Sequence, residues 1–179
     1  MRVVFVTADG DRVRAEDVDR PLHEAAFAAL DVDLEYRWWS DNSTDWGSFD
    51  LVVLRSPWDY SDRIVEFIAW LDSIAGLPTL QNPAGLVRWN LDKAYLLDLE
   101  SMGVPIVKTT LVSEMGDVVP ALNSAGSTEV IVKPAVSAGS RLTGWFLAGD
   151  SAAVDLAQQI LHEGGKVLVE PFIRSVKDL

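Results

Sequence analysis

The first half of the chain alternates between short apolar runs and segments whose apolar residues recur at helical spacing. The runs are rich in β-branched residues, which is typical of buried parallel strands. The helical spacing is clearest over residues 21–30, which follow Asp19 as a candidate N-cap, and over residues 64–74. This order predicts a small α/β domain with a parallel sheet. We expect its strands at residues 2–8, 32–38 and 49–55.

The second half has a different order of elements, beginning near residues 81–90. Asn82 and Pro83 begin a short helix through Trp89, and Asn90 is the predicted N-cap of a further helix that ends at Gly103. Strands and helices then alternate in a way that predicts an antiparallel α+β layer with helices on one face. We divide the chain into residues 1–85 and residues 86–179. The expected strands are 105–112, 129–135, 142–149 and 166–173, and the expected helices are 117–126 and 151–165.

Composition narrows the classes of function. The chain of 179 residues is 49% hydrophobic and 23% charged, the balance of a globular protein. Its net charge of -12 argues against duplex nucleic acid and anionic membranes as partners. It has no cysteine, no apolar run long enough for a membrane span, and an opening too short and acidic for a signal peptide. We therefore expect a cytoplasmic protein.

Lys93 is the first candidate ligand contact. In a helix capped by Asn90 it would lie in the first turn, where a cation opposes the helix dipole. A bound anion there would turn this cost into a gain, because free N–H groups and the ammonium would converge on it. The alternative is a solvated surface lysine that the neighbouring Asp92 neutralises.

Lys133 ends the apolar strand VIVKPA and is followed by a loop of small residues. The loop offers backbone N–H groups, hydroxyls and little bulk, which suits a flap over phosphates. A plain hairpin turn after an exposed lysine explains the same pattern, and no G-x-x-x-x-G-K-[ST] motif is present. The loop consists of Ser137, Ala138, Gly139 and Ser140.

The strand VLVEPFI contains a proline, which cannot donate to a ladder, so pairing is expected to stop at Pro171. The carbonyl of Pro171 and the N–H of Ile173 would then be available to an adenine edge, with Phe172 beside the ring. The alternative is a strand that simply ends at a proline.

Taken together, a lysine at a helix start, VKPA with its small-residue loop, and EPFI resemble the nucleotide-binding half of the ATP-grasp superfamily. With LVVLRSPWDY and NPAGLVRWNLDKAYLLDLESMGVPIVKTT, the chain resembles the group related to the O-ureido-serine cyclo-ligase of cycloserine biosynthesis. The resemblance runs from Val6 to Val176. It implies a pre-ATP-grasp domain followed by the small subdomain of a glutathione-synthetase-like ATP-binding fold.

The resemblance also implies roles for these residues. Lys93 and Lys133 would contact the ATP phosphates, with Lys133 also near the adenine, and the small-residue loop would be the phosphate flap. Asp178 would contact the ribose. The adenine hinge would be Glu170, Pro171, Phe172 and Ile173.

Substrate contacts are expected at the carboxyl ends of the N-terminal strands, where α/β domains bind ligands. In the alternative interpretation these residues form a turn in which Asp59 caps the next helix and Trp58 packs in the core. The expected substrate is a small polar molecule. The candidates are Thr7, Arg55, Trp58, Asp59 and Tyr60.

The resemblance implies an ATP-dependent ligase that joins a carboxyl-type carbon to an amine through a phosphorylated intermediate. The larger ATP-binding subdomain of the family, with its magnesium ligands and catalytic residues, would follow Leu179. We therefore expect ATP and Mg²⁺ as cofactors, no metal ligand in this chain, and little turnover by this chain alone.

Two other classes of function stay open. One is a non-catalytic nucleotide-binding or partner-binding module that keeps the front half of the fold. The other is an α/β domain with no nucleotide site and simply exposed lysines. The edge left after Ile173 predicts self-association or instability.

Overall fold

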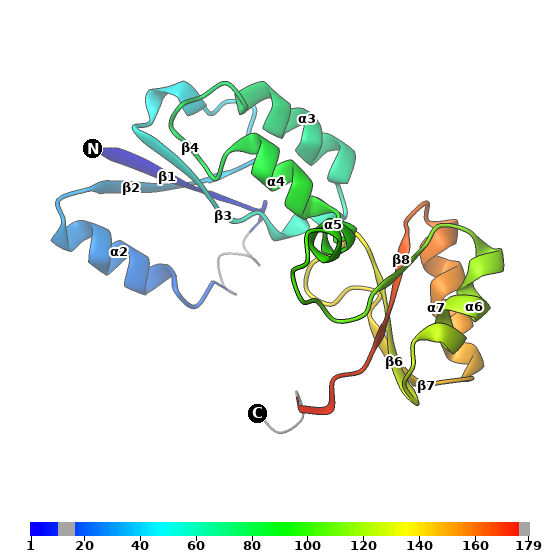
Figure 1. Ribbon diagram of the computed structural model, residues 1–179. Coiled ribbons are helices and arrows are strands. Elements are labelled where there is room, and N and C mark those ends of the chain that lie inside the picture. The colour runs from blue at the N-terminus through cyan, green and yellow to red at the C-terminus, as the bar shows by residue number, and fades with distance from the viewer. Residues whose placement is uncertain (11–16, 176–179) are drawn as a thin grey trace. The chain divides into compact units, whose positions relative to one another are not determined.

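The computed structural model describes residues 1–10 and 17–175 and divides the chain into two compact units, Met1–Trp89 and Asn90–Leu179. The division falls a few residues after the boundary placed from the sequence. Each unit is described by itself (Figure 1). None of the described helices has the length and apolarity that a membrane crossing requires. Asp178, the candidate ribose contact, lies outside the described residues.

The first unit is built on a parallel sheet in the order β2-β1-β3-β4, which confirms the predicted architecture. Its central strand β1 is buried along nearly its whole length, as the apolar run at the start of the sequence predicts. The strands are β1 (Arg2–Thr7), β2 (Asp33–Trp38), β3 (Leu51–Ser56) and β4 (Leu80–Gln81). The helices are α2 (Arg20–Ala29), α3 (Ile64–Ile74) and α4 (Ala84–Leu91), with 3₁₀ turns η1 (Trp46–Ser48) and η2 (Trp58–Ser61).

Aromatic side chains form most of the packing beneath α3. Phe67 is 1% exposed. The centroid of its ring lies 5.3 Å from that of Trp39, 5.3 Å from that of Trp70 and 5.6 Å from that of Tyr60. These tilted and edge-to-face pairs fix the helix against the chain that follows β2 and β3. The carboxyl ends of β2 and β3 are thus anchored by the core.

The second unit contains an antiparallel sheet in the order β5-β8-β6-β7, as predicted. Strands β6 and β7 form the hairpin that encloses the small-residue loop. The strands are β5 (Thr110–Val112), β6 (Glu129–Pro134), β7 (Gly144–Leu147) and β8 (Val167–Pro171). The helices are α5 (Tyr95–Ser101), α6 (Val118–Ser124) and α7 (Ser151–His162), with a 3₁₀ turn η3 (Met115–Asp117).

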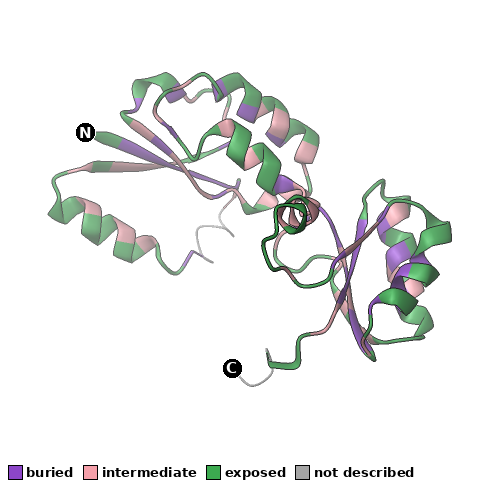
Figure 2. Cartoon of the chain, in the orientation of Figure 1, coloured by how far each residue is buried: buried purple, intermediate pink, exposed green. Residues whose placement is uncertain are grey.

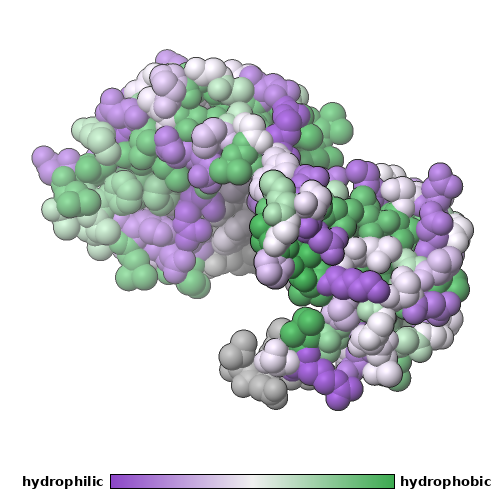
Figure 3. All heavy atoms as spheres, in the orientation of Figure 1, coloured by the Kyte–Doolittle hydropathy of each residue, from purple (hydrophilic) through white to green (hydrophobic). Residues whose placement is uncertain are grey.

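Alternation along the strands gives this sheet one apolar and one mixed face. Val130, Val132, Val167 and Val169 point to α6 and α7 and form the buried core with them (Figure 2). The residues between them, including Lys133 and Glu170, therefore lie on the opposite face. In Figure 3 hydrophilic and hydrophobic residues are interspersed over the visible surface.

Two predictions about this unit were wrong. Asn90 does not cap a helix but lies inside α4, and Lys93 lies in the turn before α5 rather than in a first helical turn. Helix α5 has no side-chain cap, and Asp92 instead holds the turn before it, where its carboxylate accepts the N–H of Ala94 at 2.8 Å. The strand expected over 105–112 is limited to Thr110–Val112.

Candidate functional site

Glu170 lies on the mixed face of the second sheet, which does not pack on α6 and α7 and which we call the open face. It links β8 to β6 and to the residue before β5. Its carboxylate accepts a hydrogen bond from Lys133 Nζ at 2.7 Å and another from Thr109 Oγ1 at 3.2 Å. Glu170 is buried, and the Lys133 side chain is 22% exposed. A carboxylate that is removed from water needs such partners, so Glu170 holds the ammonium at this end of β6.

Lys93 is joined to the chain that follows Lys133. Its backbone N–H donates to the Ala135 carbonyl at 2.9 Å. Its Nζ donates to the Ser137 carbonyl at 2.8 Å and approaches the Ser137 hydroxyl at 3.1 Å. Asp92 does not neutralise Lys93 by contact, because its carboxylate binds the Ala94 N–H and, at 3.2 Å, Lys166 Nζ. The structure thus brings Lys93 to the loop predicted as a phosphate flap.

The small-residue loop has an unusual backbone. Gly139, Ser140 and Leu142 have φ angles of 57°, 59° and 51°. For the two residues with side chains this conformation costs about 1–3 kcal/mol each, and such strain gathers at ligand-binding segments. Arg141, next in the loop, pairs with Glu163 of the turn after α7 at 3.0 Å.

The end of β8 fits the predicted hinge with one change. Pairing does not stop at Pro171 on the side of β6, because Phe172 N–H still donates to the Glu129 carbonyl at 2.9 Å. Backbone groups alternate along a strand, so the Pro171 carbonyl and the Ile173 N–H point to the side of β5. There the ladder ends at the Thr110–Val169 pair in the described chain. The two groups therefore lie beyond the last pair of the β5–β8 ladder, where the prediction places the adenine edge.

Trp145 was not predicted as a site residue. It lies on β7 opposite Ile131, which in turn lies opposite Glu170, so the three side chains share the open face. Its indole is 50% exposed and 5.8 Å from the Phe172 ring. The signal in the sequence was the alternation in GWFL, since placing Phe146 in the core turns Trp145 to the other face.

Burial lowers the pKa of the Lys93 ammonium, and the positive charge of Lys133 lowers it further, while Asp92 and Glu170 act in the opposite direction. In the unfolded chain this lysine binds its proton more tightly than in the folded chain. The free energy of unfolding should therefore rise with pH from the lowered pKa up to the ordinary lysine value.

We expect this rise in the wild type and not in Lys93→Met, when the two are compared by urea denaturation from neutral to alkaline pH. The difference between the two proteins removes the contribution of other titrating groups. A difference that falls with pH over this range would contradict the burial of the Lys93 charge.

The candidate substrate residues gather at the carboxyl edge of the first sheet. Thr7 is buried and pairs in register with Ser56, the residue after Arg55. The guanidinium of Arg55 is 2.9 Å from Asp19 and 4.0 Å from Asp17. Thr7 and Arg55 thus share this edge, as predicted.

The alternative structural roles of Trp58 and Asp59 are wrong. Trp58 is 39% exposed and so is not a core residue. Asp59 does not cap α3, since Arg63 precedes that helix and no side chain caps it. The Asp59 carboxylate instead accepts the Trp39 indole N–H at 2.7 Å and lies 3.5 Å from Arg63. Burial raises the pKa of Tyr60, whose ring packs on Phe67.

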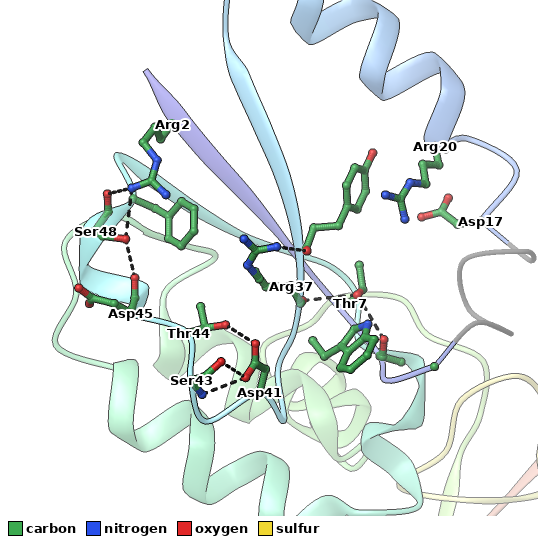
Figure 4. A pocket seen from close by; sticks show the side chains of 15 residues that line it. Arg2, Thr7, Asp17, Arg20, Arg37, Asp41, Ser43, Thr44, Asp45 and Ser48 are labelled. Atoms are coloured by element: carbon green, nitrogen blue, oxygen red, sulfur yellow. Dashed lines mark hydrogen bonds between the residues drawn. The ribbon is translucent and has the colours of Figure 1, made fainter.

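A hollow of about 540 Å³ lies elsewhere in the first unit, alongside β2 (Figure 4). Of the residues predicted to contact a ligand, only Thr7 lines it. Its arginines have acidic partners: Arg2 and Arg37 bind Glu35, and Arg20 binds Glu24. The hollow therefore does not coincide with the candidate nucleotide site.

Magnesium ligands are a separate question. Among residues 1–10 and 17–175, no group of three or more histidine, aspartate or glutamate side chains is arranged to hold a metal ion. The described residues thus do not fit the cation that accompanies ATP, and we derive no step through it.

The comparisons with known proteins agree with this arrangement. Residues 3–82 match the family model of the N-terminal domain of D-cycloserine synthetase DcsG. The chain is 32% identical over 167 residues to the cycloserine biosynthesis protein DcsG of Streptomyces lavendulae, covering 89% of this chain and 56% of that protein.

One solved structure shows the same relationship, and a second shows the fold alone. The crystal structure of D-cycloserine synthetase DcsG matches with a TM-score of 0.86 and 30% identity, over 98% of this chain and 61% of that chain. The ATP complex of D-alanine–D-alanine ligase from Bacillus anthracis matches in fold, with a TM-score of 0.67 and 16% identity, over 97% of this chain and 59% of that chain. The chain thus spans somewhat more than half the length of these proteins.

Proposed function

Because this chain belongs to the ATP-grasp superfamily, we propose that its second unit binds ATP for a ligase that joins a carboxyl-type carbon to an amine. The observation that carries the proposal is the grouping of Lys93, Lys133, the small-residue loop and the hinge in one unit. Lys93 bonds to Ala135 and Ser137, and Lys133 is held by Glu170. Segments far apart in the sequence therefore offer positive charge, backbone N–H groups and an unpaired strand end to one ligand.

The phosphates are the proposed ligands of the two lysines and of residues 137–140. In this structure the Lys93 ammonium donates to the Ser137 carbonyl and hydroxyl, and the Lys133 ammonium donates to Glu170. A polyphosphate would replace Ser137 as the partner of Lys93 and relieve the repulsion from Lys133 that lowers the Lys93 pKa. Bonds between two charged groups are stronger than the bonds from the Lys93 ammonium to the neutral Ser137 oxygens that they displace.

The adenine is the proposed ligand of the hinge. The Pro171 carbonyl accepts from the exocyclic amine, and the Ile173 N–H donates to the adjacent ring nitrogen. Trp145 and Phe172 provide an apolar wall on the same face. Guanine carries a carbonyl where adenine carries its amine, so we expect ATP to bind at least about tenfold more tightly than GTP.

The proposed reaction has two steps. The γ-phosphoryl group of ATP passes to a carboxyl-type oxygen of the substrate and ADP leaves. An amine then attacks the activated carbon, and phosphate departs with the oxygen. Thr7, Arg55, Trp58, Asp59 and Tyr60 are the proposed substrate contacts, and Arg55 is suited to an anionic group once it exchanges its aspartate partners.

Truncation of Trp145 tests the hinge. We expect Trp145→Ala to weaken ATP binding by about 5- to 100-fold, because stacking on a base contributes about 1–3 kcal/mol. Tripolyphosphate, which has no base, should bind the variant as well as it binds the wild type. Isothermal titration calorimetry of both ligands, with and without Mg²⁺, measures this. Equal losses for the two ligands would show that Trp145 supports the fold rather than the base.

A further inference from the structure

Strand β2 is an edge of the first sheet, with no neighbour but β1 in the described chain. Asp33 N–H donates to the Met1 carbonyl at 3.0 Å, and Trp39 N–H donates to the Thr7 carbonyl at 3.1 Å. The backbone N–H and C=O groups of the odd-numbered residues of β2 thus point to β1. By alternation, the backbone groups of Leu34, Tyr36 and Trp38 point away from the sheet.

The sequence of β2 is complementary to itself in the antiparallel direction. In a pairing whose twofold axis passes beside Tyr36, Glu35 of each copy lies opposite Arg37 of the other. Leu34 lies opposite Trp38, whose side chain is 48% exposed. Opposite charges and apolar pairs at facing positions stabilise antiparallel strands. Tyr36 would pair with its own counterpart through two backbone hydrogen bonds.

The edge has room and unsatisfied bonding capacity. The hollow of about 540 Å³ runs beside β2 and is lined by Tyr36, Arg37 and Trp38 among others. Arg37 folds back so that its guanidinium donates to the outward carbonyl of Tyr36 at 3.3 Å (Figure 4). It also binds Glu35. The Trp38 carbonyl accepts Asp41 N–H at 3.0 Å. A second β2 strand could still form the two backbone bonds between the Tyr36 residues and the bonds from each Trp38 N–H to the opposite Leu34 carbonyl.

We propose that β2 is a homodimer interface, at which the β2 strands of two copies pair antiparallel and join two four-stranded sheets into one. Arg37 leaves its own Glu35 and Tyr36 and binds Glu35 of the second copy. The isologous geometry requires one patch that complements itself, and the Glu35–Arg37 spacing around Tyr36 meets that requirement. An unrelated extended peptide would need the same alternation of acid and base.

The size of the interface sets the expected affinity. A pair of six-residue strands buries less than a standard protein–protein interface, so we expect a dissociation constant on the order of 10 µM. Sedimentation equilibrium of the 179-residue chain across this concentration range measures it.

Charge reversal provides the decisive variants. In Glu35→Lys both charged positions of the edge are basic, and in Arg37→Glu both are acidic. Each variant alone should associate more weakly than the wild type by more than about tenfold, because like charges then face each other twice. An equimolar mixture of the two should form a heterodimer at about the wild-type affinity. Arg88→Glu reverses an exposed arginine paired with Asp72 in the same unit and should leave dimerisation unchanged.

Recovery in the mixture separates pairing across the edge from a role of the Glu35–Arg37 contact in folding, which mixing cannot restore. Circular dichroism of each variant checks that it is folded. The proposal is overturned by a wild type that stays monomeric at 100 µM, by variants that associate like the wild type, or by folded variants whose mixture does not associate. Monomers that bind an added extended peptide at β2 would likewise assign the edge to another partner.

Discussion

Lys133→Met is expected to reduce ATP binding by about 10- to 150-fold, since a charge-assisted contact to phosphate contributes about 1.5–3 kcal/mol and a second lysine cannot replace it. The Lys133 ammonium is held 2.7 Å from Glu170 on the open face of the second sheet. Removing it also removes the positive charge that lies between Glu170 and an incoming polyphosphate, so repulsion adds to the loss. Isothermal titration calorimetry measures the change.

This substitution needs two controls. It leaves the buried carboxylate of Glu170 without its cation, which costs stability whether or not ATP binds. The double variant Lys133→Met/Glu170→Gln removes the unpaired charge and should still fail to bind ATP. Lys108→Met removes an exposed lysine of the same unit, bonded to the Ser124 carbonyl, and should bind ATP normally. Wild-type affinity in the folded double variant would exclude Lys133 as a phosphate contact.

Phe67→Ala is expected to lower the free energy of unfolding of the first unit by about 3–5 kcal/mol, the cost of removing a buried aromatic ring. Phe67 is 1% exposed and packs on Trp39, Tyr60 and Trp70. The neighbouring side chains cannot easily move into the cavity that the Phe67 ring leaves, because they are large rings on several sides of it. This core anchors η2, so loss of Phe67 should also disorder the proposed substrate edge.

Tryptophan fluorescence during urea denaturation reports this change, because every tryptophan but Trp145 lies in the first unit. Val65→Ala, on the same helix and 78% exposed, is the matched control and should change the unfolding free energy by less than about 0.5 kcal/mol. Equal effects of the two substitutions would mean that α3 does not pack through Phe67.

The sequence predicted the strands of the first unit well, because their burial leaves a strong local signal. Residues 3–6 are apolar without interruption, and the structure confirms a buried central strand there. Helix α3 has the predicted bounds, since its apolar residues keep one face. The hairpin of β6 and β7 followed from two strands separated by a short polar loop.

The start of α5 could not be read from the sequence. Asn90 is a good capping residue by propensity, but α4 continues through it to Leu91, and α5 begins at Tyr95 without a side-chain cap. Tertiary contacts hold the turn between the two helices: Asp92 binds Lys166, and the Lys93 backbone N–H bonds to Ala135. Lys93 therefore reached the site through these contacts rather than through a helix dipole, so the original reason for selecting it was wrong.

The contacts between the site residues also could not be predicted from local sequence patterns. Glu170 was selected as part of the hinge, but its contacts with Lys133 and Thr109 join β8 to β6 and to the residue before β5. The position of Trp145 beside Glu170 and Phe172 depends on the cross-strand register of the sheet, which the local sequence does not give.

The central claim is that ATP binds the open face of the second sheet, and amide NMR tests it most directly. Titration of the ¹⁵N-labelled chain with ATP should shift the resonances of Lys93, Ser137, Ile173 and the Trp145 indole together, with one dissociation constant. Resonances of the first unit's core, such as Val4 and Phe67, should stay in place. An unchanged spectrum at saturating ATP, or shifts confined to the first unit, would contradict the account.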